Sequence, residues 1–144
     1  MFTRILVATD GSEYSREALK MAVELAKKFN SEIELLHVIT EPIPYLGSDL
    51  SSFWHQLTDE QIKEIGNKVM EMTLWGVSPE NIDIIKKIVT GYPAEEILNE
   101  IRRDFDLVIM GTRGHGPLAG AVAGSVTQRV IADADCPVLV VKIG

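Results

Sequence analysis

The sequence is poor in the residue types that form covalent cross-links and metal clusters. Its 144 residues include one cysteine, Cys136, and three histidines. A single thiol excludes an intrachain disulfide and a cysteine-based zinc cluster, and it fits a reducing compartment. Cys136 begins an apolar run, so we expect a buried structural thiol and not a nucleophile. His37, His55 and His115 lack the spacing of metal ligands, which argues against a zinc site.

Long apolar runs and an excess of positive charge are also missing. No stretch approaches the roughly 18 apolar residues of a membrane span, and the N-terminus lacks the apolar segment of a signal peptide. The chain carries 14 Lys and Arg residues against 21 Asp and Glu residues, a formal net charge of −7. This balance disfavours binding to nucleic acid or to an anionic membrane. We therefore expect a cytoplasmic protein with neither as a partner.

The common catalytic and nucleotide signatures are absent as well. The chain has no G-x-S-x-G elbow, no H-E-x-x-H pair and no G-x4-G-K-[ST] loop. Gly114, Gly116 and Gly120 loosely resemble a dinucleotide fingerprint, but that fingerprint belongs in the first strand-to-helix turn. These glycines follow the fourth expected strand, so they do not support dinucleotide binding.

What is present is the composition of one globular domain. Hydrophobic residues make up 46% and charged residues 24% of the chain, and no internal repeat divides it, so we expect a single domain over residues 1–144. Short apolar runs predict strands at 5–8, 33–39, 82–89, 106–110 and 136–141. Helices are expected after Ser12 or Ser15, after Thr58, from Pro93, and from Gly124 or Ser125.

Local patterns add detail to these elements. Thr58 and Gln61 have the spacing of a capping box. The segment 41–57, with two prolines and three serines, is predicted to be a long loop. Trp54 and Trp75 are expected in the core, in preference to a lid. Periodicity in the first helix predicts one buried face made of Ala18, Met21, Ala22, Leu25, Ala26 and Phe29.

Strands and helices alternate strictly in this prediction, beginning and ending with a strand. Strands without polar alternation are typical of a parallel sheet covered by helices on both faces, so the fold class is α/β, doubly wound. Ligands bind such sheets beyond the carboxyl ends of the strands, where the strand order reverses. Asp10 ends the first strand and Gly111 ends the fourth. If these strands are neighbours, the two residues share one site.

The most informative segment begins at Gly111. Gly111, Gly114, Gly124 and Ser125 form the pattern G-x2-G-x9-G-S between an apolar strand and a helix start. Glycine lets a backbone approach a ligand closely, and the first amides of a helix lack internal partners. Ser125 adds a hydroxyl that either caps the helix or binds a phosphate oxygen. The pattern predicts a nucleotide phosphate between Gly111 and Thr127, in preference to a connection that needs glycine for turns alone.

Two charged residues beside these glycines have alternative roles. Asp10 accepts hydrogen bonds from ribose hydroxyls or holds a divalent cation, or it belongs to the turn and helix cap at Gly11 and Ser12. Arg113 pairs with phosphate oxygens or points to water, and the sequence favours neither.

These segments together resemble one known family. Residues 5–12, 91–97, 106–111 and 136–141, with the glycine pattern, resemble the ATP-binding branch of the universal stress protein family. The order and spacing of the segments agree over nearly the whole chain. The segment 41–57 is typically divergent in the family.

The resemblance implies a five-stranded parallel sheet of order 3-2-1-4-5 and a homodimer joined through the last strand. It also implies ATP as the ligand, with Mg²⁺ or Mn²⁺ held by Asp10. Residues expected beside the adenosine are Ala8, Thr9, Asp10 and Val38. Residues expected against the ribose and phosphates are Met110, Gly111, Arg113 and Gly114. Residues expected to bind phosphate through amides and hydroxyls are Gly124, Ser125, Val126 and Thr127.

Three functions follow from this reasoning. The favoured one is an ATP-binding regulatory protein of the stress response, a nucleotide-dependent switch with an unidentified protein partner. The alternative is a slow Mg²⁺-dependent ATPase or phosphotransfer protein that uses Asp10 and Arg113, but the sequence offers no clear general base. A dimerising interaction module that binds no nucleotide ranks last, because the glycine pattern is intact.

Overall fold

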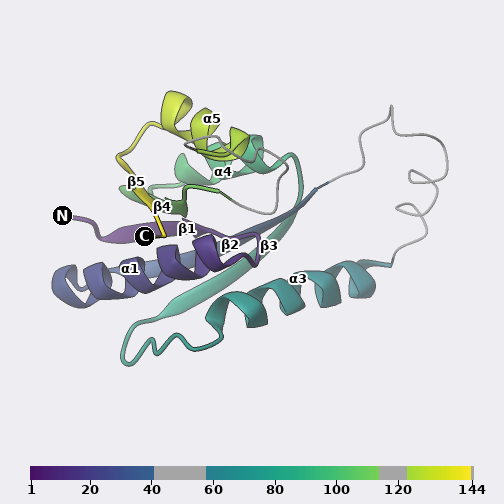
Figure 1. The fold of residues 1–144 in the computed structure, drawn as a ribbon, viewed down its shortest axis with the longest axis horizontal. Helices are drawn as coiled ribbons and strands as arrows, with labels where there is room; N and C mark the ends of the chain where they lie inside the picture. Colours follow the sequence, from purple (N-terminus) through teal and green to yellow (C-terminus); the bar gives the residue numbers. More distant parts are fainter. Residues whose placement is uncertain (41–57, 114–122, 144) are drawn as a thin grey trace.

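Strands and helices alternate through the described residues, in the predicted order (Figure 1). The computed structural model describes residues 1–40, 58–113 and 123–143. The strands are β1 (Arg4–Ala8), β2 (Glu32–Thr40), β3 (Ile84–Gly91), β4 (Leu107–Gly111) and β5 (Val138–Val141). The helices of the described residues are α1 (Glu13–Phe29), α3 (Asp59–Leu74), α4 (Pro93–Ile101) and α5 (Ser125–Asp133).

The five strands form one parallel sheet of order β3-β2-β1-β4-β5, as predicted. β1 lies in the middle, and its Ile5 pairs with Ile33 of β2 and with Leu107 of β4. Helices α1 and α3 cover one face of the sheet, and α4 and α5 cover the other (Figure 1). All carboxyl ends therefore meet at one edge, and the strand order reverses between β1 and β4.

Each face of the sheet has its own apolar core. In β1, Ile5 and Val7 pack under α1 and α3, whereas Leu6 and Ala8 pack under α4 and α5. This double burial explains why the central strands show no polar alternation. The same expectation is wrong for β3, because that strand is a sheet edge and leaves Ile85 and Lys86 exposed.

The buried face predicted for α1 is partly wrong. Met21 and Phe29 are exposed, whereas Leu19 and Val23 pack against the sheet. Two apolar stripes overlap in this helix, and the sheet contacts the stripe that contains Ser15, Ala18, Leu19, Ala22, Val23 and Ala26. Of the two predicted caps, Ser12 is the N-cap, and its hydroxyl accepts a hydrogen bond from the Ser15 amide at 3.2 Å.

Of the other local predictions, some are confirmed and some are wrong. The capping box of Thr58 and Gln61 is present, and Pro93 is the first residue of α4, as predicted. The prediction that Trp75 lies in the core is wrong: the side chain is exposed, and its ring centroid lies 5.4 Å from the guanidinium of Arg16. The predictions for Trp54 and for the loop at 41–57 fall outside the described residues. Cys136 is half-buried and precedes β5, so its predicted burial is only partial.

Candidate functional site

The carboxyl ends of β1 and β4 lie side by side, and helix N-termini adjoin both strands. Val7 of β1 pairs with Ile109 of β4, so Asp10 and Gly111 follow neighbouring strands. The chain passes from Asp10 into α1, and α5 starts again beside the end of β4. The strand order thus brings together the two features that the sequence suggested would share a site.

The Asp10 carboxylate takes part in the turn that starts α1. Its Oδ1 accepts hydrogen bonds from the Ser12 amide at 3.0 Å and from the Ser15 hydroxyl at 3.3 Å. Gly11 between them has φ of +82°, a conformation that side chains disfavour. The turn-and-cap role of Asp10 is therefore confirmed. Its role toward ribose or a cation stays a prediction.

The amide, carbonyl and hydroxyl of Thr9 all form hydrogen bonds within the protein. Its amide donates to the Leu36 carbonyl at 2.9 Å, and its carbonyl lies 2.8 Å from Nδ1 of His37. Its hydroxyl oxygen accepts from the Gly11 amide at 3.0 Å and lies 2.6 Å from the hydroxyl of Thr73 on α3. Thr9 is suited to shaping the Asp10 turn from beneath.

The sequence prediction missed Thr73 and His37. They lie on α3 and β2, so no local motif links them to Asp10. A weak signal for Thr73 existed, because a threonine on the buried side of an amphipathic helix needs a hydrogen-bond partner. His37 lies inside the apolar run of β2, and its Nδ1 reaches the Thr9 carbonyl in the same turn.

Short hydrogen bonds hold the end of β4 against the start of α5. The Gly124 amide donates to the Thr112 carbonyl at 2.7 Å, and the buried Thr127 hydroxyl donates to the Gly111 carbonyl at 3.0 Å. The Thr112 amide in turn donates to the Val141 carbonyl of β5 at 3.0 Å. The two ends of the segment 114–122 are therefore fixed close together, and Gly114 itself falls outside the described residues.

The N-terminus of α5 has the features of an anion site. Gly124 is the N-cap and supplies no side-chain cap, and Gln128 is the first residue whose amide bonds back to it. Within the described part of the chain, the amides of Ser125, Val126 and Thr127 have no backbone acceptor. Such amides and the helix dipole together attract negative charge. Ser125 is exposed and is the first helical residue, so its hydroxyl does not serve as the cap.

The two site glycines exist for different reasons. A Cβ on Gly111 would lie 2.6 Å from the Cβ of Tyr14 and 2.8 Å from its backbone carbon, so the packing of α1 alone requires glycine there. A Cβ on Gly124 would come no closer than 3.7 Å, to Arg113. A side chain at Gly124 would therefore make only ordinary van der Waals contacts with the described residues. Arg113 itself is half-buried beside it.

Apolar side chains line the same end of the sheet on the α4 and α5 side. Ala8, Val38 and Met110 belong to one buried cluster that also contains Ile97 and Leu98. These three predicted residues are each less than one-tenth exposed. They come from three adjacent strands and form the floor beneath the strand ends.

The described residues contain no cluster of side chains that could bind a metal ion without further ligands. No three His, Cys, Asp or Glu side chains converge there as a metal site requires. A cation at Asp10 would therefore need oxygen ligands from a bound molecule, such as phosphates. None of the described helices is long and apolar enough to cross a membrane.

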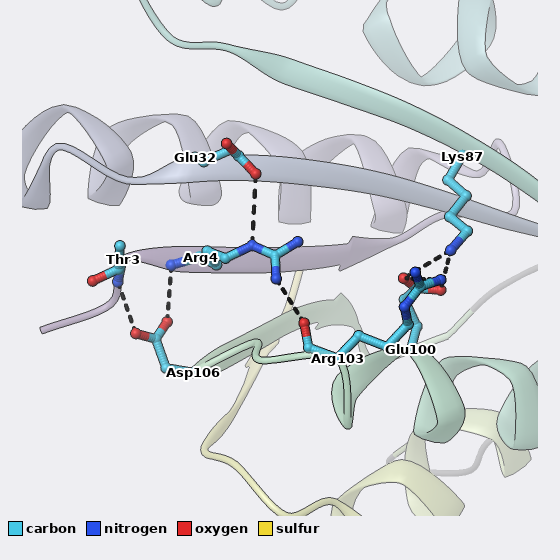
Figure 2. Close-up of polar contacts among 7 residues, drawn as sticks. All are labelled: Thr3, Arg4, Glu32, Lys87, Glu100, Arg103 and Asp106. Carbon is cyan, nitrogen blue, oxygen red and sulfur yellow. Dashed lines mark hydrogen bonds and ion pairs between the residues drawn. The ribbon is translucent and has the colours of Figure 1, made fainter.

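A second polar region lies on the α4 side of the sheet, between the amino end of β1 and the middle of β3. Figure 2 shows Lys87 of β3 donating to both carboxylate oxygens of Glu100 on α4, at 2.9 and 2.8 Å. A pocket of about 410 Å³ lies here, lined by Arg4, Glu34, Lys87, Glu100, Arg103 and Asp104. Burial raises the pKa of the Glu34 carboxyl to about 7, and the charge of Glu100 adds to the rise.

At Cys136, burial likewise raises the pKa of the thiol.

Comparisons with known proteins agree on one family. The family described as the universal stress protein family matches residues 1–142. Universal stress protein MJ0531 of Methanocaldococcus jannaschii is 35% identical over 143 residues, which cover 99% of this chain and 83% of that protein. The solved structure of MJ0577 aligns with a TM-score of 0.80 and 34% identity over 100% of this chain and 98% of that one. A universal stress protein from Archaeoglobus fulgidus, solved in complex with dAMP, shares the fold at 19% identity and a TM-score of 0.65, over 96% and 97% of the two chains.

Proposed function

This chain belongs to the universal stress protein family, and from that premise we propose that it binds ATP at the carboxyl end of its sheet and acts as a nucleotide-dependent regulatory switch. The observation that carries the proposal is the uncapped N-terminus of α5, fixed by hydrogen bonds beside Gly111 and Thr112. The complex of the Archaeoglobus fulgidus protein with dAMP supports an adenine nucleotide as the ligand class.

The phosphates are proposed to bind the amides of residues 125–127. A helix N-terminus carries about half a positive charge, and three amides that have no backbone acceptor among the described residues supply directed donors. The Ser125 hydroxyl is exposed, and Arg113, half-buried beside Gly124, is proposed to pair with phosphate oxygens. Thr127 has a different part, because its hydroxyl proton goes to Gly111 and fixes the helix start.

The nucleoside is proposed to lie over the ends of the central strands. Ala8, Val38 and Met110 provide the apolar surface nearest to the adenine, and Asp10 accepts hydrogen bonds from the ribose hydroxyls. When Mg²⁺ or Mn²⁺ accompanies ATP, Asp10 and phosphate oxygens together hold the cation.

The switch is proposed to act through the end of β4 and the start of α5. A nucleotide that contacts both favours one placement of α5 against β4. A differential affinity of a few kcal/mol is enough to shift such an equilibrium. The changed surface would then meet a protein partner, in the cytoplasm where ATP is abundant.

The proposal includes a homodimer joined through β5. This strand is a sheet edge, and all four of its residues are half-buried in the single chain. Pairing with a second copy would satisfy its free edge and cover Val138 and Val140 further.

Two substitutions that add the same charge test the site. Gly124→Asp places a carboxylate at the N-cap of α5, where aspartate is a favoured cap and so preserves the helix. It should lower the affinity for ATP by about 100-fold through repulsion of the phosphates, measured by isothermal titration calorimetry. Ser78→Asp, an exposed position between α3 and β3, is the control for added charge and should bind as the wild type does. Wild-type protein that binds no ATP, or a Gly124→Asp variant that binds normally, contradicts the proposal.

A further inference from the structure

A chain of buried hydroxyls connects α3 to the Asp10 carboxylate. Thr73 of α3 is wholly buried, and its Oγ1 lies 2.6 Å from Oγ1 of Thr9. Oγ1 of Thr9 lies 2.9 Å from Oγ of Ser15, and Oγ of Ser15 lies 3.3 Å from Oδ1 of Asp10. Four residues, from α3, α1 and the turn after β1, thus form one continuous path of hydrogen bonds.

Counting protons shows that Thr73 influences what Asp10 receives. Each hydroxyl has one proton to donate. In one ordering Thr73 donates to Thr9, Thr9 donates to Ser15, and Ser15 donates to Asp10. All three protons then point toward the carboxylate, and hydrogen bonds in such a chain strengthen one another.

A second ordering turns the same protons away. Thr73 also lies 2.8 Å from the Val69 carbonyl, and Ser15 lies 2.9 Å from the Ser12 carbonyl. If both donate to these carbonyls, the Thr9 proton goes to Thr73 or to Ser15, and the Asp10 Oδ1 loses the hydroxyl donor of Ser15. Thr73 thus acts on the Asp10 hydrogen bond indirectly: when it donates to Thr9, it favours and strengthens the ordering in which Ser15 donates to Asp10.

The last turns of α3 also hold the Asp10 turn mechanically. Nε and one terminal nitrogen of Arg16 donate to the Met72 carbonyl at 3.2 and 2.9 Å. The backbone at Gly11 lies against the side chains of Val69 and Met72, which a Cβ there would meet at 3.4 and 3.7 Å. A displacement of α3 would thus disturb both the packing and the hydrogen bonding of the turn.

We propose that Thr73 is a positioning residue for the nucleotide site: through Thr9 and Ser15 it sets the Asp10 carboxylate for the ribose hydroxyls, so that the placement of α3 regulates ribonucleotide affinity. The inference rests on the proposed function, since it concerns the same site. It assigns to α3 a role in ribose recognition although this helix supplies no ligand contact itself.

Ligands with and without ribose hydroxyls separate this role from a structural one. Thr73→Val keeps the shape of the side chain and removes the hydroxyl, whereas Thr73→Ser keeps the hydroxyl. We expect Thr73→Val to lower the affinity for ATP by about threefold, because it weakens the Ser15 hydrogen bond to Asp10 without removing it, and to leave the affinity for 2′,3′-dideoxyATP unchanged. Thr73→Ser should restore most of the loss for ATP. Thr90→Val, at an exposed threonine of β3, is the matched control and should bind both ligands normally.

The other outcomes have distinct meanings. Equal losses for ATP and 2′,3′-dideoxyATP in Thr73→Val, or no loss for either, would overturn the inference. Equal binding of the two ligands by the wild type would overturn it too, while leaving the proposed function intact. Wild-type protein that binds neither ligand defeats the proposed function itself. Should Thr73→Val fail to fold, Ser15→Ala breaks the same chain one link nearer to Asp10 and carries the same expectation.

Discussion

The two ends of the sheet use polar groups in opposite ways. At the amino end, charged side chains pair with one another: Lys87 with Glu100, and Arg4 with Glu32 at 3.6 Å (Figure 2). At the carboxyl end, hydroxyls and backbone amides dominate, and the first amides of α5 lack backbone acceptors within the described chain. Charged side chains that pair with one another stabilise a fold, whereas backbone amides without an internal acceptor can bind a ligand.

The amino end also ties the sheet together at its centre. The carboxylate of Asp106, just before β4, accepts hydrogen bonds from the Thr3 amide at 2.8 Å and the Arg4 amide at 3.1 Å. The Arg4 guanidinium reaches the Arg103 carbonyl at 2.6 Å and lies 4.2 Å from the centroid of the Phe105 ring. These contacts join β1 to the α4–β4 connection.

One carboxyl group disturbs this closed arrangement. Glu34 is only 8% exposed, and among the described residues its Oε2 is a buried side-chain oxygen with no hydrogen-bond partner. Burial, followed by the neighbouring Glu100, raises its pKa from 4.5 to about 7. The proton on Glu34 is thus part of the stable amino end near neutral pH.

Replacing the two site glycines by alanine should change stability by very different amounts. Gly111→Ala forces a methyl group into the backbone of Tyr14, and overpacking of this kind should lower the free energy of unfolding by about 3 kcal/mol. Gly124→Ala meets only ordinary contacts and should cost about 1 kcal/mol or less, chiefly through weaker capping. Urea denaturation of both variants measures the difference. Equal losses would mean that the end of β4 is not packed as described.

A smaller, pH-dependent effect tests the amino end. Because the folded pKa of Glu34 lies above its unfolded value, its protonated form stabilises the fold below about pH 4.5, and that contribution is lost as the pH rises through 7. Glu34→Gln should therefore gain stability relative to the wild type between pH 5 and pH 8, by about 2 kcal/mol. Glu32→Gln, at an exposed position of the same strand, should show no such gain. Urea midpoints at the two pH values decide, and a Glu34→Gln difference that does not vary with pH would refute the role given to this proton.

Local signals in the sequence were enough to predict most of the fold. The capping box at Thr58, Pro93 at the start of α4 and the apolar runs of the strands depend on residues close in the chain, and each is in place. The face of α1 and the exposure of Trp75 depend on which neighbour each element meets. Sequence periodicity carries no such information, and there the prediction failed.

In the candidate site, too, the sequence could predict some neighbours but not the contacts between distant elements. The strand order made Asp10 and Gly111 neighbours, which a topological argument could anticipate. Thr73 lies 64 positions from Thr9, so their contact follows only from the folded arrangement of α3 against α1. The sequence interpretation of Gly111 as a phosphate contact also missed the side chain that actually requires glycine there, Tyr14.

A titration followed by amide NMR tests the contrast between the two ends most directly. Magnesium-ATP added to ¹⁵N-labelled protein should shift the amide signals of residues 10–12, 111–113 and 125–127 in a saturable manner. The amides of Arg4, Glu32 and Arg103 should stay in place, because these residues lie at the amino end of β1, away from the proposed site. Saturable shifts confined to the amino end, or no shifts at any ATP concentration, would contradict the assignment of the nucleotide site to the carboxyl end.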